Sequence, residues 1–179
     1  MHDPAQYVSE PAPGRACGAC TLCCKVFEIP PLAKPAGRWC VHCKPGAGCG
    51  AYEARPQHCR SFHCLWMLQD WLGPEWKPDR ARMVLTIDPV TNFMLVQLDP
   101  GQPGAWRREP YYAQLKAFAA ASLPKGRFVV VFLNRSGTVV LPDRDVPLGV
   151  FEPGDRLVAE ERPGPGGMRL EIEKVRAAA

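Results

Sequence analysis

The cysteines are the residues of this sequence whose type and spacing indicate chemistry. All nine lie between Cys17 and Cys64, and the rest of the 179-residue chain contains none. Thiolate sulfur binds zinc, iron–sulfur clusters and other soft metal ions. Where thiols stay reduced, so dense a local set predicts metal binding rather than a disulfide framework or a scatter of small core residues.

The spacing of the first cysteines predicts more than one metal position. They read Cys17-x2-Cys20-x2-Cys23-Cys24. A bacterial ferredoxin motif opens in the same way but has its next cysteine four residues later, where this chain has Phe27. Neighbouring side chains on extended backbone point in opposite directions. We therefore expect Cys23 and Cys24 to serve two sites, or one of them to bridge.

The last two cysteines carry a prediction about local structure. Cys59 and Cys64 are five positions apart, which is about 140° of rotation on a helix. If they share a metal ion, the helix must begin between them. Ser61 is the expected N-cap, the apolar residues of 62–72 follow, and Gly73-Pro74 is the expected stop. This predicts Cys64 in the first helical turn and Cys59 in the preceding loop.

These motifs together resemble a known family. The run C-x2-C-x2-C-C is followed by a cysteine after Gly-Arg-Trp, and then by Cys-x2-Tyr-Glu-x-Arg-Pro-x2-Cys-Arg-x-Phe-x-Cys. Over residues 17–64 the chain resembles the CxxCxxCC zinc- or iron-chelating domain of the YkgJ-like cysteine cluster proteins. A similar motif occurs in flagellin lysine N-methylases, where it is associated with an iron–sulfur cluster. The resemblance implies a metal-chelating module whose ligands are Cys17, Cys20, Cys23, Cys24, Cys40, Cys49, Cys59 and Cys64.

Four further residues could join or replace these ligands. Cys43 is not part of the family pattern and is either a spare ligand or a free thiol. His42, His58 and His63 flank cysteines and could each replace a thiol. With nine cysteines available, we expect each of these histidines to face solvent or to pack instead.

The chain beyond the cysteines predicts strands and one helix. Alternating and β-branched runs separated by turn residues indicate three hairpins, and a helix is expected over residues 111–123. The fold class is therefore α+β, with a small cysteine-rich, metal-stapled N-terminal module docked on a mainly antiparallel sheet with one helix. The hairpins are expected at 83–88 with 92–98, 127–133 with 138–141, and 155–161 with 168–175.

Composition suggests three segments in the chain. Residues 1–14 contain three prolines and a glycine and are expected to be a flexible arm. Residues 15–75 are the expected cysteine-cluster module, and residues 76–179 the α+β domain. The arm has no basic start with an apolar run, and the longest apolar run in the chain, 128–133, is far too short to span a bilayer. We therefore expect no membrane partner and a cytoplasmic location.

The charge of the chain gives no reason to expect nucleic acid. The formal value of +4 counts cysteines as neutral, and thiolates around two divalent ions would bring it to about zero. We see no Gly-rich nucleotide loop and no spacing that indicates a nucleophile, so no catalytic residue is predicted. The expected function is metal binding, with zinc at two sites and a structural or metal-handling role. The alternative is an iron or iron–sulfur protein, a redox protein or an accessory to an enzyme, with a protein partner still to be identified.

Overall fold

The centre of the molecule is a five-stranded sheet. The computed structural model describes residues 10–164 and 167–176. The strands lie in the order β3-β4-β5-β6-β7, and all neighbours are antiparallel except β4 and β5. Mixed helix and mainly antiparallel sheet confirm the α+β class. The strands are β3 (Met83–Ile87), β4 (Met94–Leu98), β5 (Val129–Leu133), β6 (Ser136–Val140) and β7 (Asp145–Val150).

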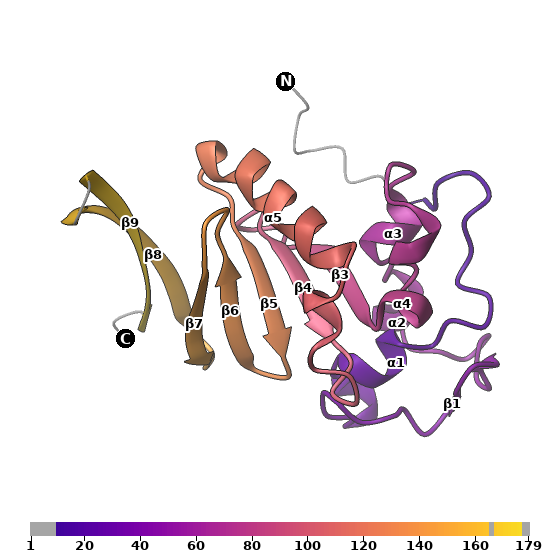
Figure 1. Cartoon of the computed structure of the whole chain (residues 1–179). Coiled ribbons are helices and arrows are strands. Elements are labelled where there is room, and N and C mark those ends of the chain that lie inside the picture. Colours follow the sequence, from indigo (N-terminus) through magenta and orange to yellow (C-terminus); the bar gives the residue numbers. More distant parts are fainter. Residues whose placement is uncertain (1–9, 165–166, 177–179) are drawn as a thin grey trace.

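One long helix explains the parallel pair. Parallel neighbours need a crossover connection, and here α5 (Tyr111–Ser122) connects β4 to β5. Leu115 and Ala119 of this helix are buried in a core that residues of the sheet also form. Figure 1 shows α5 lying along the sheet. The helix expected at 111–123 is therefore confirmed, and the chain continues past it in a short 3-10 turn, η4 (Leu123–Lys125).

All three expected hairpins are present, and one strand of the five-stranded sheet was missed. β3 pairs with β4, β5 with β6, and β8 (Asp155–Gly164) with β9 (Gly167–Arg176). The last pair forms a separate ribbon beyond β7 (Figure 1). Sequence reasoning missed β7 because Pro147 and Gly149 lie within it. A proline is tolerated there because β7 is the edge strand of its sheet.

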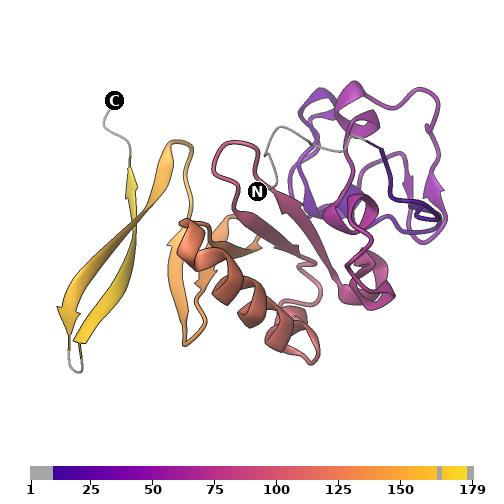
Figure 2. The same ribbon diagram turned by 90° about the horizontal axis from the view of Figure 1, so that it is seen from above.

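The cysteine-rich segment consists of very short elements. Figure 2 shows it as a loop-rich body beside the sheet. In chain order these elements are α1 (Cys23–Val26), η1 (Pro30–Leu32), β1 (Cys43–Lys44), β2 (Gly48–Cys49), α2 (Gln57–Arg60) and α3 (Leu65–Leu68). The turns η2 (Pro74–Trp76) and α4 (Pro78–Ala81) then lead into β3, and η3 (Ala105–Arg107) follows β4.

The cysteine module is docked on the sheet through shared cores. Leu65 and Trp76 belong to the core beneath α5, while Leu22 and Val26 pack with Val84 of β3. Arg15 adds a polar tie, donating from Nη1 to the Trp66 carbonyl at 2.6 Å. The parts of the module near both of its ends are therefore held by ordinary apolar burial. In the described ranges no helix has the length and apolarity needed to cross a membrane. Residues 1–9 of the expected arm lie outside them.

Candidate metal centre

All nine cysteines lie within the described ranges, and none of them is in a disulfide. Cys40 and Cys64 are buried, Cys17 is exposed, and the others are half-buried. They are therefore free thiols in a small volume, the state in which cysteine can bind metal.

Tight turns bring some of these thiols together in pairs. The Cys20 amide donates to the Cys17 carbonyl at 2.9 Å, and the Cys43 amide donates to the Cys40 carbonyl at 3.0 Å. Each is a C-x2-C turn, the spacing common among structural zinc ligands. Cys49 lies opposite Cys43 in the β1–β2 hairpin. The loop of that hairpin needs glycine at Gly46, where φ is +74°.

The backbone at Cys23 and Cys24 is helical, so the expectation of extended backbone was wrong. Both residues lie in α1, where successive side chains are about 100° apart. The cause is tertiary, because Leu22 and Val26, four residues apart, bury one face against Val84. A hydrogen bond between the two thiols raises the pKa of Cys23 well above its usual value and lowers that of Cys24 to about 6.

The structure also corrects the expected helix after Cys59. Cys59 lies inside α2 rather than in a loop, and Ser61 ends α2 instead of capping the next helix. The chain turns helical early because Pro56 precedes it with φ −56°, close to the helical value. Cys64 is the N-cap of α3, which ends at Leu68 and is far shorter than expected.

Three thiols form a first group, defined by Cys17, Cys20 and Cys64. Burial raises the pKa of Cys64 to about 11, and the charges of Cys17 and Cys20 add to the shift. Burial also raises the pKa of Cys17 and of Cys20, and Cys17 raises that of Cys20 further. These thiols come from the two ends of the module, so the fold brings together residues far apart in the sequence.

The second group consists of Cys24, Cys40, Cys43, Cys49 and Cys59. Burial raises the pKa of Cys59, and the charges of Cys24, Cys40 and Cys49 add to it. Burial likewise raises the pKa of Cys43 to about 11, with further contributions from Cys24 and Cys40. Cys43 is hydrogen-bonded to Cys24. The structure thus places Cys43 among the expected ligands, although the family pattern does not include it.

A buried lysine lies beside the second group. Lys34 is 7% exposed, and its Nζ donates to the carbonyls of Lys25 and Phe27. No carboxylate within the described ranges forms an ion pair with it. Burial lowers the pKa of Lys34, and the charges of Cys24 and Cys40 oppose that shift. Thiolates are therefore the negative charges nearest to the Lys34 ammonium group. No signal in the sequence pointed to Lys34.

The thiols are gathered but do not converge on a point. Among the residues that the structure describes, no three His, Cys, Asp or Glu side chains are arranged so that they could hold a metal ion. His42 and His58 are exposed, and His63 is half-buried. Ion binding would therefore require the sulfurs of a group to move closer together. The donor set itself, which is all thiol, suits zinc or iron.

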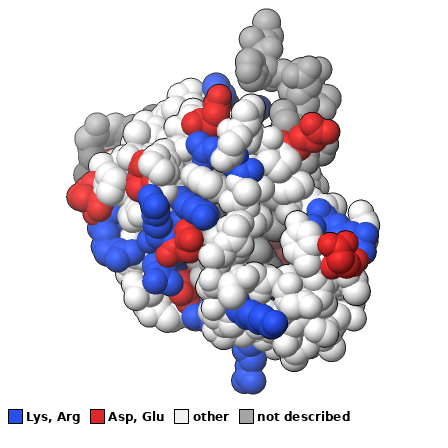
Figure 3. All heavy atoms as spheres, turned by 90° about the vertical axis from the view of Figure 1, so that its right-hand side faces the viewer, with Lys and Arg blue, Asp and Glu red and all other residues white. Residues whose placement is uncertain are grey.

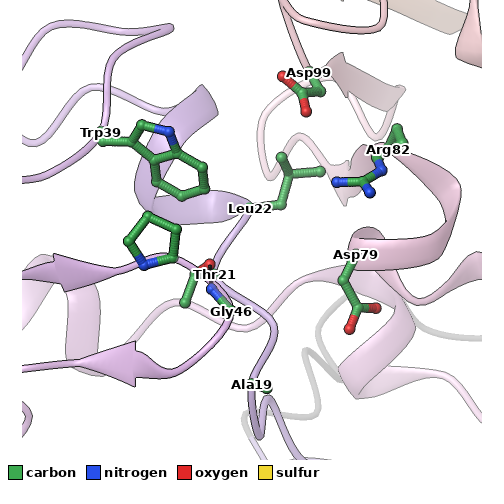
Figure 4. A pocket seen from close by; sticks show the side chains of 9 residues that line it. Ala19, Thr21, Leu22, Trp39, Gly46, Asp79, Arg82 and Asp99 are labelled. Atoms are coloured by element: carbon green, nitrogen blue, oxygen red, sulfur yellow. Dashed lines mark hydrogen bonds between the residues drawn. The ribbon is translucent and has the colours of Figure 1, made fainter.

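A cavity of about 360 Å³ lies between part of the cysteine module and the sheet side of the molecule. Figure 4 shows Trp39 and Thr21 on one wall and Asp79 and Asp99 on the other. The full lining of this cavity is Ala19, Thr21, Leu22, Trp39, Pro45, Gly46, Asp79, Arg82 and Asp99.

On the face seen in Figure 3, Lys and Arg are interspersed with Asp and Glu, and much of the surface carries no charge.

The chain was also compared with known proteins. No protein-family model, no curated protein and no solved structure gives a match. The candidate site therefore has to be argued from its own residues.

Proposed function

We propose that residues 17–64 form a metal-chelating module of the CxxCxxCC type, with zinc at two sites and a structural or metal-handling role. The observation that carries this proposal is the burial pattern of the segment. No side chain from 41 to 60 is buried, although every residue of that stretch is described. The segment includes Cys43, Cys49 and Cys59.

A segment without buried side chains needs another source of stability. Ordering a backbone costs roughly 1–2 kcal/mol per residue, and residues 41–60 have only half-buried side chains to offset it. Structural zinc bound by thiolates contributes on the order of 10 kcal/mol in small domains. Disulfides could serve the same purpose in other proteins, but all nine cysteines are free here. Bound metal ions are therefore the cross-links best suited to stabilise this segment.

The grouping of the thiols supports two ions rather than one. The first ion would use Cys17, Cys20 and Cys64 with Cys23 as the fourth sulfur, because the charges of Cys17 and Cys20 also act on Cys23. The second ion would use four sulfurs of the second group. Cys23 and Cys24, adjacent in α1, lie where the two groups meet. Lys34 would offset part of the negative charge that a four-thiolate zinc site carries.

The test is metal analysis of protein purified without air. We expect two zinc ions per chain and no visible absorption. A brown sample with iron and inorganic sulfide would replace zinc with an iron–sulfur cluster and favour a redox role. Protein that binds neither metal when supplied with it would overturn the proposal.

A further inference from the structure

A second hollow lies in the α+β domain and shares no residue with the cysteine module. Its volume is about 400 Å³, and its lining residues all lie between Leu98 and Thr138. Leu98 ends β4 and Leu133 ends β5, and because these two strands are parallel, both carboxyl ends lie at the same edge of the sheet (Figure 1). Ligands commonly bind beyond the carboxyl ends of parallel strands, and their pockets measure roughly 300–1,000 Å³. The position and size of this hollow therefore suit a small molecule.

Much of the lining of the hollow is apolar. Leu98 and Val131 are buried in the core that includes Leu115 of α5, and Leu133 packs against the same core. Trp106 of η3 also lines the hollow and is 6% exposed. Because the core holds these side chains in place, they present a preformed surface that an apolar or aromatic group can cover.

The polar side chains that line the hollow can all donate hydrogen bonds. They are Arg107, Ser136 and Thr138. Ser136 and Thr138 are two positions apart on β6, so their side chains lie on the same face of the sheet. A guanidinium group and two hydroxyls are suitable donors for one oxygen anion. No carboxylate is among the lining residues, so within the described chain nothing in the lining itself repels an anion.

The guanidinium group of Arg107 is held in place and still accessible. Its Cζ lies 4.4 Å from the centre of the Trp106 ring, and its Nη2 donates to Asp145 Oδ2 at 3.1 Å. The Arg107 side chain is nevertheless 57% exposed. One bond to Asp145 uses only one of the five N–H donors of a guanidinium group. Arg107 can therefore bind a further anion at a small cost in conformational entropy.

The charges around Arg107 determine the sign of the ligand. Asp145 also accepts from Lys116 Nζ at 2.8 Å, so two cations share one carboxylate and one positive charge remains. We propose that this hollow binds a small organic carboxylate. Its apolar or aromatic body covers Leu133 and Trp106, and its carboxylate accepts hydrogen bonds from Arg107. The site requires no metal ion, so it stands independently of the proposed function.

The test is a titration of the isotope-labelled full chain with phenylacetate, followed by amide NMR shifts. We expect saturable shifts at Leu98, Gly104, Leu133 and Thr138. Phenylacetamide has the same shape without the charge and should bind at least about tenfold more weakly. Inorganic phosphate has the charge without the apolar body and should also bind at least about tenfold more weakly.

Substitutions of Arg107 complete the test. Arg107→Gln should weaken phenylacetate binding at least about tenfold and leave phenylacetamide binding unchanged. Asp145 keeps its bond to Lys116 in this variant, so the fold should persist. Arg107→Lys should restore part of the affinity, because it keeps the charge without the planar fork. Arg108→Gln is the matched control, since Arg108 is exposed next in sequence and does not line the hollow.

Three outcomes would overturn the proposal. The first is the absence of saturable shifts around the hollow in the wild-type chain. The second is equal affinity for phenylacetate in Arg107→Gln and in Arg108→Gln. The third is equal affinity of the wild-type chain for phenylacetate and for either inorganic phosphate or phenylacetamide. None of these outcomes bears on the metal content of the cysteine module, which is measured separately.

Discussion

Lys34 holds its buried ammonium group beside the thiol of Cys24. A hydrogen bond from Cys23 is the largest cause that lowers the pKa of Cys24 to about 6, and Lys34 lowers it further. We predict that Lys34→Met raises the pKa of Cys24, so that its alkylation at pH 6.5 slows roughly threefold or more in metal-free protein. Lys44→Met, at an exposed lysine, is the control. Equal rates in both variants would mean that Lys34 does not act on Cys24.

The Cys24 thiol should also differ from the other thiols in how its alkylation rate depends on pH in the wild-type chain. Cys24 has a pKa of about 6 and Cys64 one of about 11. In metal-free protein, the iodoacetamide rate at Cys24 should rise through pH 6 and level off near pH 7, whereas that at Cys64 should keep rising beyond pH 9. At pH 7 we expect Cys24 to react on the order of tenfold to a hundredfold faster, allowing for its weaker intrinsic nucleophilicity. Peptide mass spectrometry measures both, and indistinguishable profiles would contradict the assignment.

The sheet, apart from β7, was predictable from sequence because the signals of its hairpins are local. Val129–Leu133 is a β-branched and aromatic run that ends in a turn, and Asn134 adopts the left-handed φ of +53° that such a turn requires. In contrast, α1 forms because Leu22 and Val26 pack on distant residues. A four-residue element of this kind is decided by tertiary contacts, which no local pattern contains.

The candidate site, too, was predictable from the sequence only in part. The spacing of cysteines such as Cys17 and Cys20 is what predicted a metal-binding set of thiols. Lys34 could not be found by spacing, because it matters only through the thiols that the fold brings beside it. Cys43 is intermediate, since its C-x2-C relation to Cys40 was visible in the sequence and only the structure places it beside Cys24.

Substitution of single cysteines should separate ligands from spare sulfurs. We predict that Cys20→Ser and Cys59→Ser each lose about one metal ion per chain, because each removes a thiolate from a different group. Cys43→Ser should retain both ions, since the second group still offers the four thiols of Cys24, Cys40, Cys49 and Cys59. Elemental analysis at equal protein concentration is the measurement. Loss of an ion from Cys43→Ser would make Cys43 a ligand, and full content in all three would show that the ligand set is wrong.

Asp145 should contribute to the stability of the fold and not to metal binding. Its carboxylate is 11% exposed and accepts from Lys116 Nζ at 2.8 Å and from the Tyr112 hydroxyl at 3.1 Å, which ties β7 to α5. Asp145→Ala should lower the free energy of unfolding by about 2–3 kcal/mol, because it leaves a half-buried ammonium group without its ion pair. Asp143→Ala is the control, since that carboxylate is 66% exposed. Denaturant unfolding measures the loss, and a drop in metal content of Asp145→Ala would contradict the separation.

Metal removal should loosen one part of the module and leave the rest folded. Residues 41–60 bury no side chain, whereas Leu65, Leu72 and Trp76 are buried in the main core. On chelation we therefore predict that the amides of 41–60 lose most of their protection from hydrogen exchange, while those of 65–76 and of α5 change little. Adding Zn²⁺ back should restore the protection. Exchange that is equal with and without metal across 41–60 would show that the thiolates do not hold this segment, and uniform loss across the chain would show that the sheet depends on the metal as well.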